Sequence, residues 1–172
     1  MLALPLAVLA AVHAGGSVAT GLSVMAFLLT SCVIPTALTV ALVRSGRASG
    51  FDLRERTDRL LPAAVTAGCC ALTAWLLSRS GAPLSICNLA LALSIQMALL
   101  ACLTLWWKVS YHAASASTLV LVSYSASGTG PLTLALVVLA MSIAWARVYQ
   151  RRHTLAQVAV GALTAIPIAM LA

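Results

Sequence analysis

The sequence predicts an all-α fold, a polytopic bundle of transmembrane helices. Three observations predict it: 62% of the 172 residues are hydrophobic, only 8% are charged, and uncharged apolar stretches recur along the whole chain. Soluble domains carry about 25% charged residues, and a helix needs about 20 apolar residues to cross a bilayer. The apolar runs lack the alternation of a membrane barrel, so helices are the remaining way to satisfy backbone hydrogen bonds in lipid.

Glycine, proline and charged clusters divide the chain into apolar segments, which predicts about six to seven membrane helices in a single domain over residues 1–172. The seven segments are Met1–Ala14, Ser17–Val43, Arg59–Ser78, Pro83–Trp107, His112–Ser127, Pro131–Val148 and His153–Leu171. A secretion signal has a basic residue ahead of its apolar run, and the first segment has none. We therefore interpret this segment as a short membrane helix. Glycine and proline at 81–83 and 127–131 predict tight turns between antiparallel helices.

Polar residues concentrate in three connections, at 44–59, 108–112 and 147–153. Two predicted crossings separate each consecutive pair, so all three connections are expected on one membrane face, with Arg79 on the other. That face holds all three acids and nine of the ten basic residues, namely Arg44, Arg47, Arg54, Arg56, Arg59, Lys108, Arg147, Arg151 and Arg152. One polar site at this interface is the economical interpretation. The alternative is a set of basic loops that only orient the protein.

Two histidines distinguish these connections from ordinary orientation loops. His112 and His153 stand at the starts of two predicted helices, where free backbone N–H groups and the helix dipole favour a bound anion. Histidine also changes its charge near neutral pH, which suits acid–base chemistry. We therefore expect an anion site there, although interfacial histidines without a chemical role remain an alternative. Arg151 and Arg152 are interpreted as contacts to lipid headgroups.

Three sequence patterns follow one another along the polar connections. They are Arg56-Thr57-Asp58-Arg59-Leu60-Leu61-Pro62, then Val109-Ser110-Tyr111-His112-Ala113, then Ala146-Arg147 with His153 six residues and Gln157 ten residues after Arg147. In order and spacing they resemble the three signatures of the type 2 phosphatidic acid phosphatases, or lipid phosphate phosphatases, over residues 44–172. The main departures are Asp52, where that family has Lys, and Gln157, where it has Asp.

The resemblance implies a metal-independent phosphatase in which His153 attacks phosphorus to form a phosphohistidine and His112 protonates the leaving group. Gln157 stands where the family orients its nucleophile, and its carbonyl can accept from the imidazole N–H but supplies no negative charge. Phosphoryl transfer also needs groups that bind the non-bridging oxygens. The candidates for that role are Arg147, Lys108, Ser110, Arg59 and Arg56.

The short connections leave little room for an extramembrane domain, so we expect a substrate anchored in the bilayer. A polyprenyl phosphate or diphosphate and a phosphatidyl phosphate both remain open. We expect membrane lipids as the other partners, no nucleic acid, because the basic residues lack aromatic interleaving, and no protein partner. No cofactor or metal is expected, since the acids share one loop and the histidines lack zinc spacing.

Two alternatives to the enzyme remain open: a non-catalytic relative that binds or moves a lipid phosphate, motivated by Gln157, and a structural bundle whose basic face binds anionic lipid. Location also has two interpretations. The resemblance implies a bacterial inner (plasma) membrane with an extracytoplasmic site, whereas nine basic residues on that face favour the cytoplasm. Because a phosphate site concentrates arginine for its own reasons, we expect the extracytoplasmic side.

Overall fold

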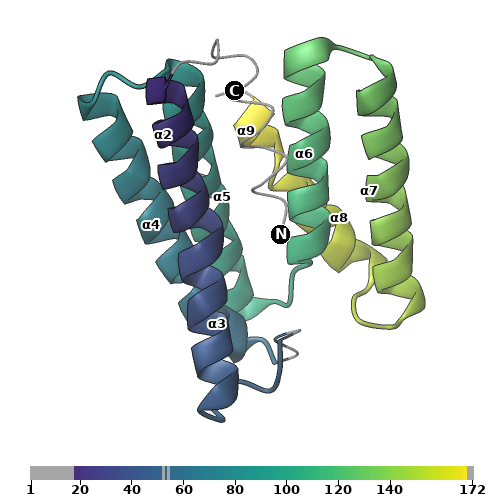
Figure 1. Cartoon of the computed structure of the whole chain (residues 1–172). Helices are drawn as coiled ribbons and strands as arrows, with labels where there is room; N and C mark the ends of the chain where they lie inside the picture. The colour runs from purple at the N-terminus through teal and green to yellow at the C-terminus, as the bar shows by residue number, and fades with distance from the viewer. Residues whose placement is uncertain (1–17, 52, 54, 170–172) are drawn as a thin grey trace.

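The computed structural model describes residues 18–51, 53 and 55–169. The expected helix Met1–Ala14, together with Asp52 and Arg54, lies outside the described residues. Within the described part every regular element is helical and no strand occurs, which confirms the all-α class (Figure 1). The elements are α2 (Val18–Leu28), η1 (Leu29–Val33), α3 (Ile34–Arg44), η2 (Thr57–Arg59), α4 (Leu60–Arg79), α5 (Leu84–Trp106), α6 (Tyr111–Ser127), α7 (Pro131–Tyr149), α8 (Leu155–Leu163) and α9 (Ile166–Ala169).

The first described segment is one long helix with a local change of winding. A π-helical turn, η1, joins α2 to α3 immediately before Pro35. Proline has no N–H to give to the preceding turn and its ring crowds the carbonyl four residues back, so the winding there widens. The hydroxyl of Ser31 donates to the carbonyl of Phe27 at 2.6 Å within this stretch.

The last apolar segment departs from expectation. The sequence predicts one helix over His153–Leu171, but the structure has two short helices, α8 and α9, separated at Thr164 and Ala165. Pro167 explains the break, because proline has no N–H to donate to the carbonyl of Leu163, four residues back. The hydroxyl of Thr164 instead donates to the carbonyl of Gly161 at 2.6 Å.

Four helices of the described chain are long and apolar enough to cross a membrane: Thr20–Arg44, Thr57–Arg79, Leu84–Trp106 and Pro131–Tyr149. This is compatible with an integral membrane protein. The expected count of six to seven spans is not confirmed, since four candidate helices are found among the described residues. α6 has 17 residues, and α8 and α9 are shorter still.

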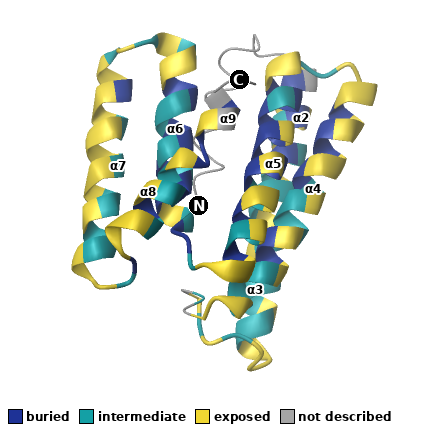
Figure 2. Cartoon of the chain, turned by 180° about the vertical axis from the view of Figure 1, so that it is seen from behind, coloured by how far each residue is buried: buried dark blue, intermediate teal, exposed yellow. Residues whose placement is uncertain are grey.

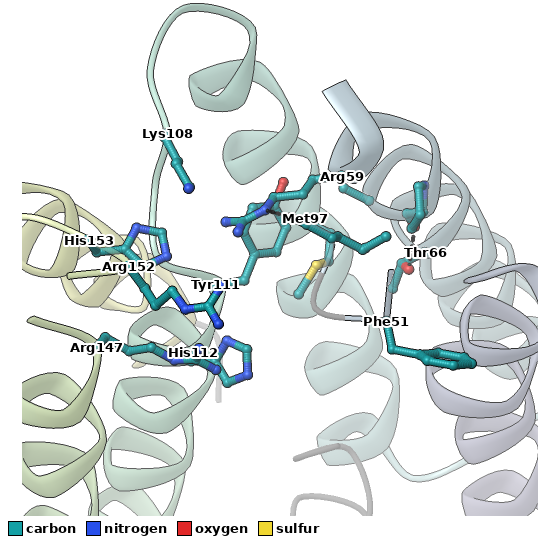
Figure 3. Close-up of a pocket in the computed structure, with 13 residues that line it drawn as sticks. Phe51, Arg59, Thr66, Met97, Lys108, Tyr111, His112, Arg147, Arg152 and His153 are labelled. Atoms are coloured by element: carbon teal, nitrogen blue, oxygen red, sulfur yellow. Dashed lines mark hydrogen bonds between the residues drawn. The ribbon is translucent and has the colours of Figure 1, made fainter. Parts of the chain in front are cut away.

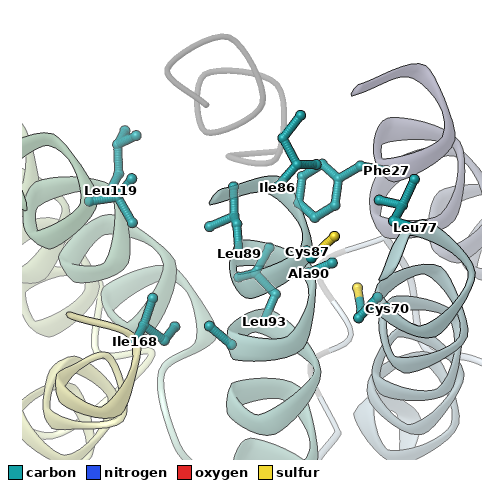
Figure 4. Packing of buried hydrophobic residues seen from close by; sticks show 13 residues of the cluster. Phe27, Cys70, Leu77, Ile86, Cys87, Leu89, Ala90, Leu93, Leu119 and Ile168 are labelled. Atoms are coloured by element: carbon teal, nitrogen blue, oxygen red, sulfur yellow. The ribbon is translucent and has the colours of Figure 1, made fainter. Parts of the chain in front are cut away.

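The core forms around α5. α4 packs along α5, and α6 and α7 form a second hairpin. α9 lies between α5 and α6, and α8 packs against α6 and α7 (Figure 1). Buried side chains from separate helices meet there, with Phe27, Leu77, Ile86, Leu119 and Ile168 in one cluster (Figure 4). The outward faces of α4 and α7 are largely exposed and apolar, as surfaces that contact lipid are (Figure 2).

A buried polar contact joins the two halves. Gln96 of α5 is only 2% exposed, and its side-chain oxygen accepts from the hydroxyl of Thr118 on α6 at 3.0 Å. Its amide donates to the carbonyl of Ala114 and to the hydroxyl of Thr164, each at 3.4 Å. In lipid such bonds hold helices together, because no water replaces them. Gln96 therefore ties α5 to α6 and to the break between α8 and α9.

All three polar connections lie at one end of the bundle. The described residues of the segment 45–56 lie at the lower end in Figure 1 with the segments 107–110 and 150–154, whereas the turns after α4 and α6 lie at the upper end, where α4 ends in Arg79. Gly81 and Gly128 adopt positive φ angles of 71° and 62° in those upper turns, a backbone conformation that glycine adopts without strain. The structure thus brings the three connections to one end of the bundle, where the sequence predicted a common membrane face (Figure 1).

Candidate functional site

The polar end contains a cavity of about 240 Å³. The loop 45–56, the starts of α4 and α6, the middle of α5 and the connection from α7 to α8 all contribute to its wall. The lining residues are Phe51, Leu53, Arg59, Pro62, Ala63, Thr66, Met97, Lys108, Tyr111, His112, Arg147, Arg152 and His153 (Figure 3). Segments more than 90 positions apart in the chain therefore meet around one space.

The charged part of this wall is entirely basic. Arg59, Lys108, Arg147 and Arg152 line the cavity together with the two histidines, and no acid is among the lining residues that the structure describes. Near a protein surface two unit charges 4 Å apart interact by about 4 kcal/mol, so an anion is attracted to a place where cations gather. Arginine adds a planar fork that binds phosphate through two hydrogen bonds. Side chains of this kind suit an anion.

The opposite part of the wall is mainly apolar. Phe51 and Thr66 lie on one side in Figure 3, and His153, Arg152, Arg147 and His112 lie on the other. Leu53, Pro62, Ala63 and Met97 are further apolar residues of the wall. The cavity therefore fits a ligand with an anionic end and an apolar end.

Arg59 joins three segments as well as carrying charge. Its Nε–H donates to the carbonyl of Leu53 at 2.7 Å, and its Nη1–H donates to the carbonyl of Val109 at 3.1 Å. The guanidinium carbon lies 5.9 Å from the centre of the Tyr111 ring, within the range of a cation–π contact. Arg59 thereby joins Leu53 to the connection before α6, and two hydrogen bonds hold its guanidinium group in place.

His153 is placed by the tight connection after α7. Its backbone N–H donates to the carbonyl of Arg147 at 3.2 Å, and the side chain is only 7% exposed. Arg151 has a φ of +53° in this turn, which is uncommon for a residue with a side chain. The imidazole Nδ1 lies 3.2 Å from Oε1 of Gln157. The contact that the resemblance implies between residues 153 and 157 is thus present, with an amide in place of a carboxylate.

The surroundings of His153 favour its neutral form. Burial, then the nearby charge of Arg59, lower the pKa of the imidazole from 6.5 to about 4, with smaller contributions from Lys108 and Arg147. The hydrogen bond to Gln157 acts in the opposite direction. A base with a lowered pKa releases its proton more readily. His153 is therefore neutral at pH 7 and keeps a lone pair on one ring nitrogen.

We predict that the imidazole of His153 titrates near pH 4 and that Gln157→Glu raises this midpoint by about one to three pH units, because an adjacent carboxylate stabilises the imidazolium. Glu also serves at the third position of a capping box, so α8 keeps its start. NMR titration of ¹⁵N-histidine-labelled protein measures both midpoints. Gln150→Glu, which adds the same charge at an exposed position of the same connection, should shift the midpoint less. An unchanged midpoint in Gln157→Glu would contradict the assigned contact.

Of the eight residues predicted for the site, five line the cavity: His153, His112, Arg147, Lys108 and Arg59. Gln157 contacts His153 without lining the cavity. Ser110 and Arg56 do not line the cavity. Ser110 is fully buried as the N-cap of α6, where its hydroxyl accepts from the N–H of Ala113 at 3.3 Å. Arg56 precedes η2 and is exposed.

Several lining residues were not predicted. Arg152, interpreted from the sequence as a headgroup contact, lines the cavity, as does Tyr111. The position of Arg152 next to His153 was the available signal. No sequence signal pointed to Phe51 and Met97, because apolar residues are ordinary in a chain that is 62% hydrophobic.

The site defines a class of protein by geometry alone: a helical bundle with a basic, histidine-containing cavity at one end. Comparison of the chain with protein-family models, curated proteins and solved structures finds no match. The resemblance to the lipid phosphate phosphatases therefore stays a prediction that depends on residues and their spacing.

Proposed function

We propose that this chain is a membrane phosphatase that hydrolyses a lipid-linked phosphate through a phosphohistidine intermediate, without a metal. One observation carries the proposal: a buried imidazole with a lowered pKa lies in a cavity that, among the described residues, is lined by three arginines, a lysine and no acid. Anion binding and a nucleophile are thereby combined in one place. Among the described residues, no three His, Cys, Asp or Glu side chains gather as a metal site would require.

The proposed reaction has two steps. The basic residues bind the non-bridging oxygens, and the lone pair of His153 attacks phosphorus in line while the bond to the leaving oxygen breaks. His112 gives its proton to that oxygen. His112 then takes a proton from water as the water oxygen attacks phosphorus, the P–N bond breaks, and inorganic phosphate leaves.

The missing carboxylate has a chemical consequence. Phosphorylation of His153 places positive charge on the imidazole, and Gln157 offers an amide dipole rather than a counter-charge. The surrounding cations disfavour that charge further, although the bound phosphoryl oxygens offset part of it. The intermediate is therefore a reactive one, and we expect it to be hydrolysed quickly.

A substrate anchored in the bilayer suits the position of the cavity. Trp106, Trp145 and Tyr149 are exposed on helices that end beside the polar connections, and the rings of Trp145 and Tyr149 stack at 5.0 Å. Exposed Trp and Tyr are typical of the depth at which lipid headgroups lie. Polyprenyl phosphates, polyprenyl diphosphates and phosphatidyl phosphates all present an anion at that depth next to an apolar tail.

The proposed placement is a bacterial inner membrane. α6 runs antiparallel to α7 as its hairpin partner (Figure 1), so we propose that it crosses as well, as does the pair α8 and α9. Together with the four candidate spans this makes six crossings. A seventh would be the segment Met1–Ala14, which is predicted from the sequence alone. We propose that the cavity opens on the extracytoplasmic side. Labelling of a cysteine introduced at Ser49, an exposed position of the loop 45–56, reports the side directly.

A second function is favoured by one residue. Gln157 leaves the imidazole without a carboxylate partner, so the same cavity would serve a protein that binds or moves a lipid phosphate without cleaving it. Both functions require the basic wall, and only the phosphatase requires the lone pair of His153.

The proposed function predicts metal-independent release of inorganic phosphate. Purified protein in detergent should release phosphate from a prenyl phosphate, a prenyl diphosphate or phosphatidic acid, at a rate that excess EDTA does not lower. Arg79→Gln, which removes a charge at the far end of the bundle, is the control and should leave the rate unchanged. Saturable binding of all three lipids with no release would instead identify the binding protein.

A further inference from the structure

The start of α8 is tied to His153 by a closed set of hydrogen bonds. The hydroxyl of Thr154 accepts from the backbone N–H of Gln157 at 3.3 Å, and the side-chain oxygen of Gln157 accepts from the backbone N–H of Thr154 at 3.1 Å. This reciprocal pair is a capping box, in which two otherwise unpaired N–H groups of a helix start are satisfied. The same Gln157 oxygen lies 3.2 Å from Nδ1 of His153.

These contacts determine which ring nitrogen carries the proton. A backbone N–H can only donate, so the Gln157 atom that faces Thr154 must be the oxygen and not the NH₂ group. The oxygen accepts, and therefore Nδ1 of His153 must donate to it. In the neutral imidazole the proton lies on Nδ1, and Nε2 is left with the lone pair.

A glycine determines where this unit lies. A Cβ at Gly161 would meet the carbonyl oxygen of Ser110 at 2.5 Å and the carbonyl carbon at 3.3 Å. Only a residue without a side chain allows α8 to approach the start of α6 so closely. The same approach lets the N–H of Ser110 donate to the carbonyl of Gln157 at 3.2 Å. Ser110 is the N-cap of α6, two residues before His112, so this contact sets His153 relative to His112.

We propose that Thr154 and Gly161 are positioning residues for His153: the hydroxyl of Thr154 holds the capping box in which Gln157 fixes the tautomer that leaves Nε2 as the attacking nitrogen, and Gly161 sets the place of that nitrogen relative to His112. The tautomer follows from the hydrogen bonds alone, whereas the role in attack rests on the proposed function. Neither residue lines the cavity. Thr154 acts through Gln157, and Gly161 acts through Ser110.

The first test compares two substitutions at Thr154. ¹⁵N-histidine-labelled protein at pH 7 should show a bare Nε2 and a protonated Nδ1 for His153, assigned by the signal lost in His153→Gln. Thr154→Ser keeps the capping oxygen and should keep this pattern. Thr154→Val keeps the shape and the backbone N–H but removes the hydroxyl that accepts from the N–H of Gln157. The first turn of α8 should loosen, weaken the contact between Gln157 and His153, and give mixed tautomers. We expect Thr154→Val to lower kcat on the order of tenfold with little change in KM, because only alignment is lost.

The second test concerns Gly161. Gly161→Ala should push α8 away from Ser110 and lower kcat on the order of 100-fold, since a displacement of about 1 Å suffices for such a loss. Gly68→Ala is the matched control, because a Cβ there meets nothing within 4 Å. Circular dichroism and thermal unfolding of each variant separate loss of alignment from loss of fold.

The outcomes separate the two proposals. A protonated Nε2 in the wild type, or an unchanged tautomer and kcat in a folded Thr154→Val, would overturn the role of Thr154. A folded Gly161→Ala with full kcat would overturn the role of Gly161. The expected tautomers in a wild type that releases no phosphate would support the positioning of the imidazole and overturn the proposed function.

Discussion

His153→Ala is expected to lower phosphate release by a factor of at least about 10³, because a covalent mechanism stops when its nucleophile is removed. The basic wall does not depend on the imidazole, so the variant should still bind the lipid phosphate. Release of inorganic phosphate under saturating substrate measures the loss, and equilibrium binding of the same lipid measures what remains.

Chemical rescue makes this test specific. The substitution leaves a space beside Gln157, and added imidazole should enter it and restore part of the rate. A role for His153 in folding alone would not respond to added imidazole. Full activity in His153→Ala would rule out the phosphohistidine, and loss of lipid binding along with activity would point to a structural role.

Arg147→Gln is expected to lower kcat/KM on the order of 10²-fold to 10³-fold, the range found when one group that stabilises transition-state charge is removed. Arg147 lines the cavity at the end of α7, and its backbone carbonyl accepts from the N–H groups of Arg152 and His153. The substitution keeps that backbone and most of the side-chain length, so the expected loss reports the guanidinium group. Steady-state phosphate release at several substrate concentrations gives kcat and KM separately.

Arg79→Gln is the matched control, because it changes the same residue type at the last turn of α4, at the opposite end of the bundle. It should leave kcat/KM within about twofold, since charges far beyond a Debye length of about 8 Å are largely screened. Equal losses in both variants would show that net charge, and not the cavity, governs the activity.

The helices and their common polar end could be predicted from the sequence because both depend on local composition. Apolar length sets a crossing and glycine or proline ends it, so counting crossings is enough to place Arg59, Lys108 and Arg147 on one face. The break at Thr164 and Ala165 was missed, although Pro167 was visible, because a proline within an apolar run predicts either a kink or a stop.

The site could be predicted only in part, and Ser110 and Arg152 show why. Ser110 sits in a helix-start pattern that suits either an anion ligand or an N-cap, and its hydroxyl caps α6. Arg152 follows Arg151, and sequence alone does not say which of two adjacent arginines turns inward. That choice depends on the backbone of the turn, where Arg151 takes a φ of +53°.

The sequence by itself therefore determined the class of fold, the face that carries the charge and five residues of the cavity, because hydropathy and helix period act over neighbouring residues. The tertiary structure alone decided which nitrogen of His153 is bare and how closely α8 approaches α6. Those features depend on the direction of one amide at Gln157 and on a carbonyl at Ser110 that a Cβ at Gly161 would strike. The contact between Gly161 and Ser110 joins segments about 50 residues apart. Neighbouring residues in the sequence do not indicate such a contact, because it forms only when the helices pack.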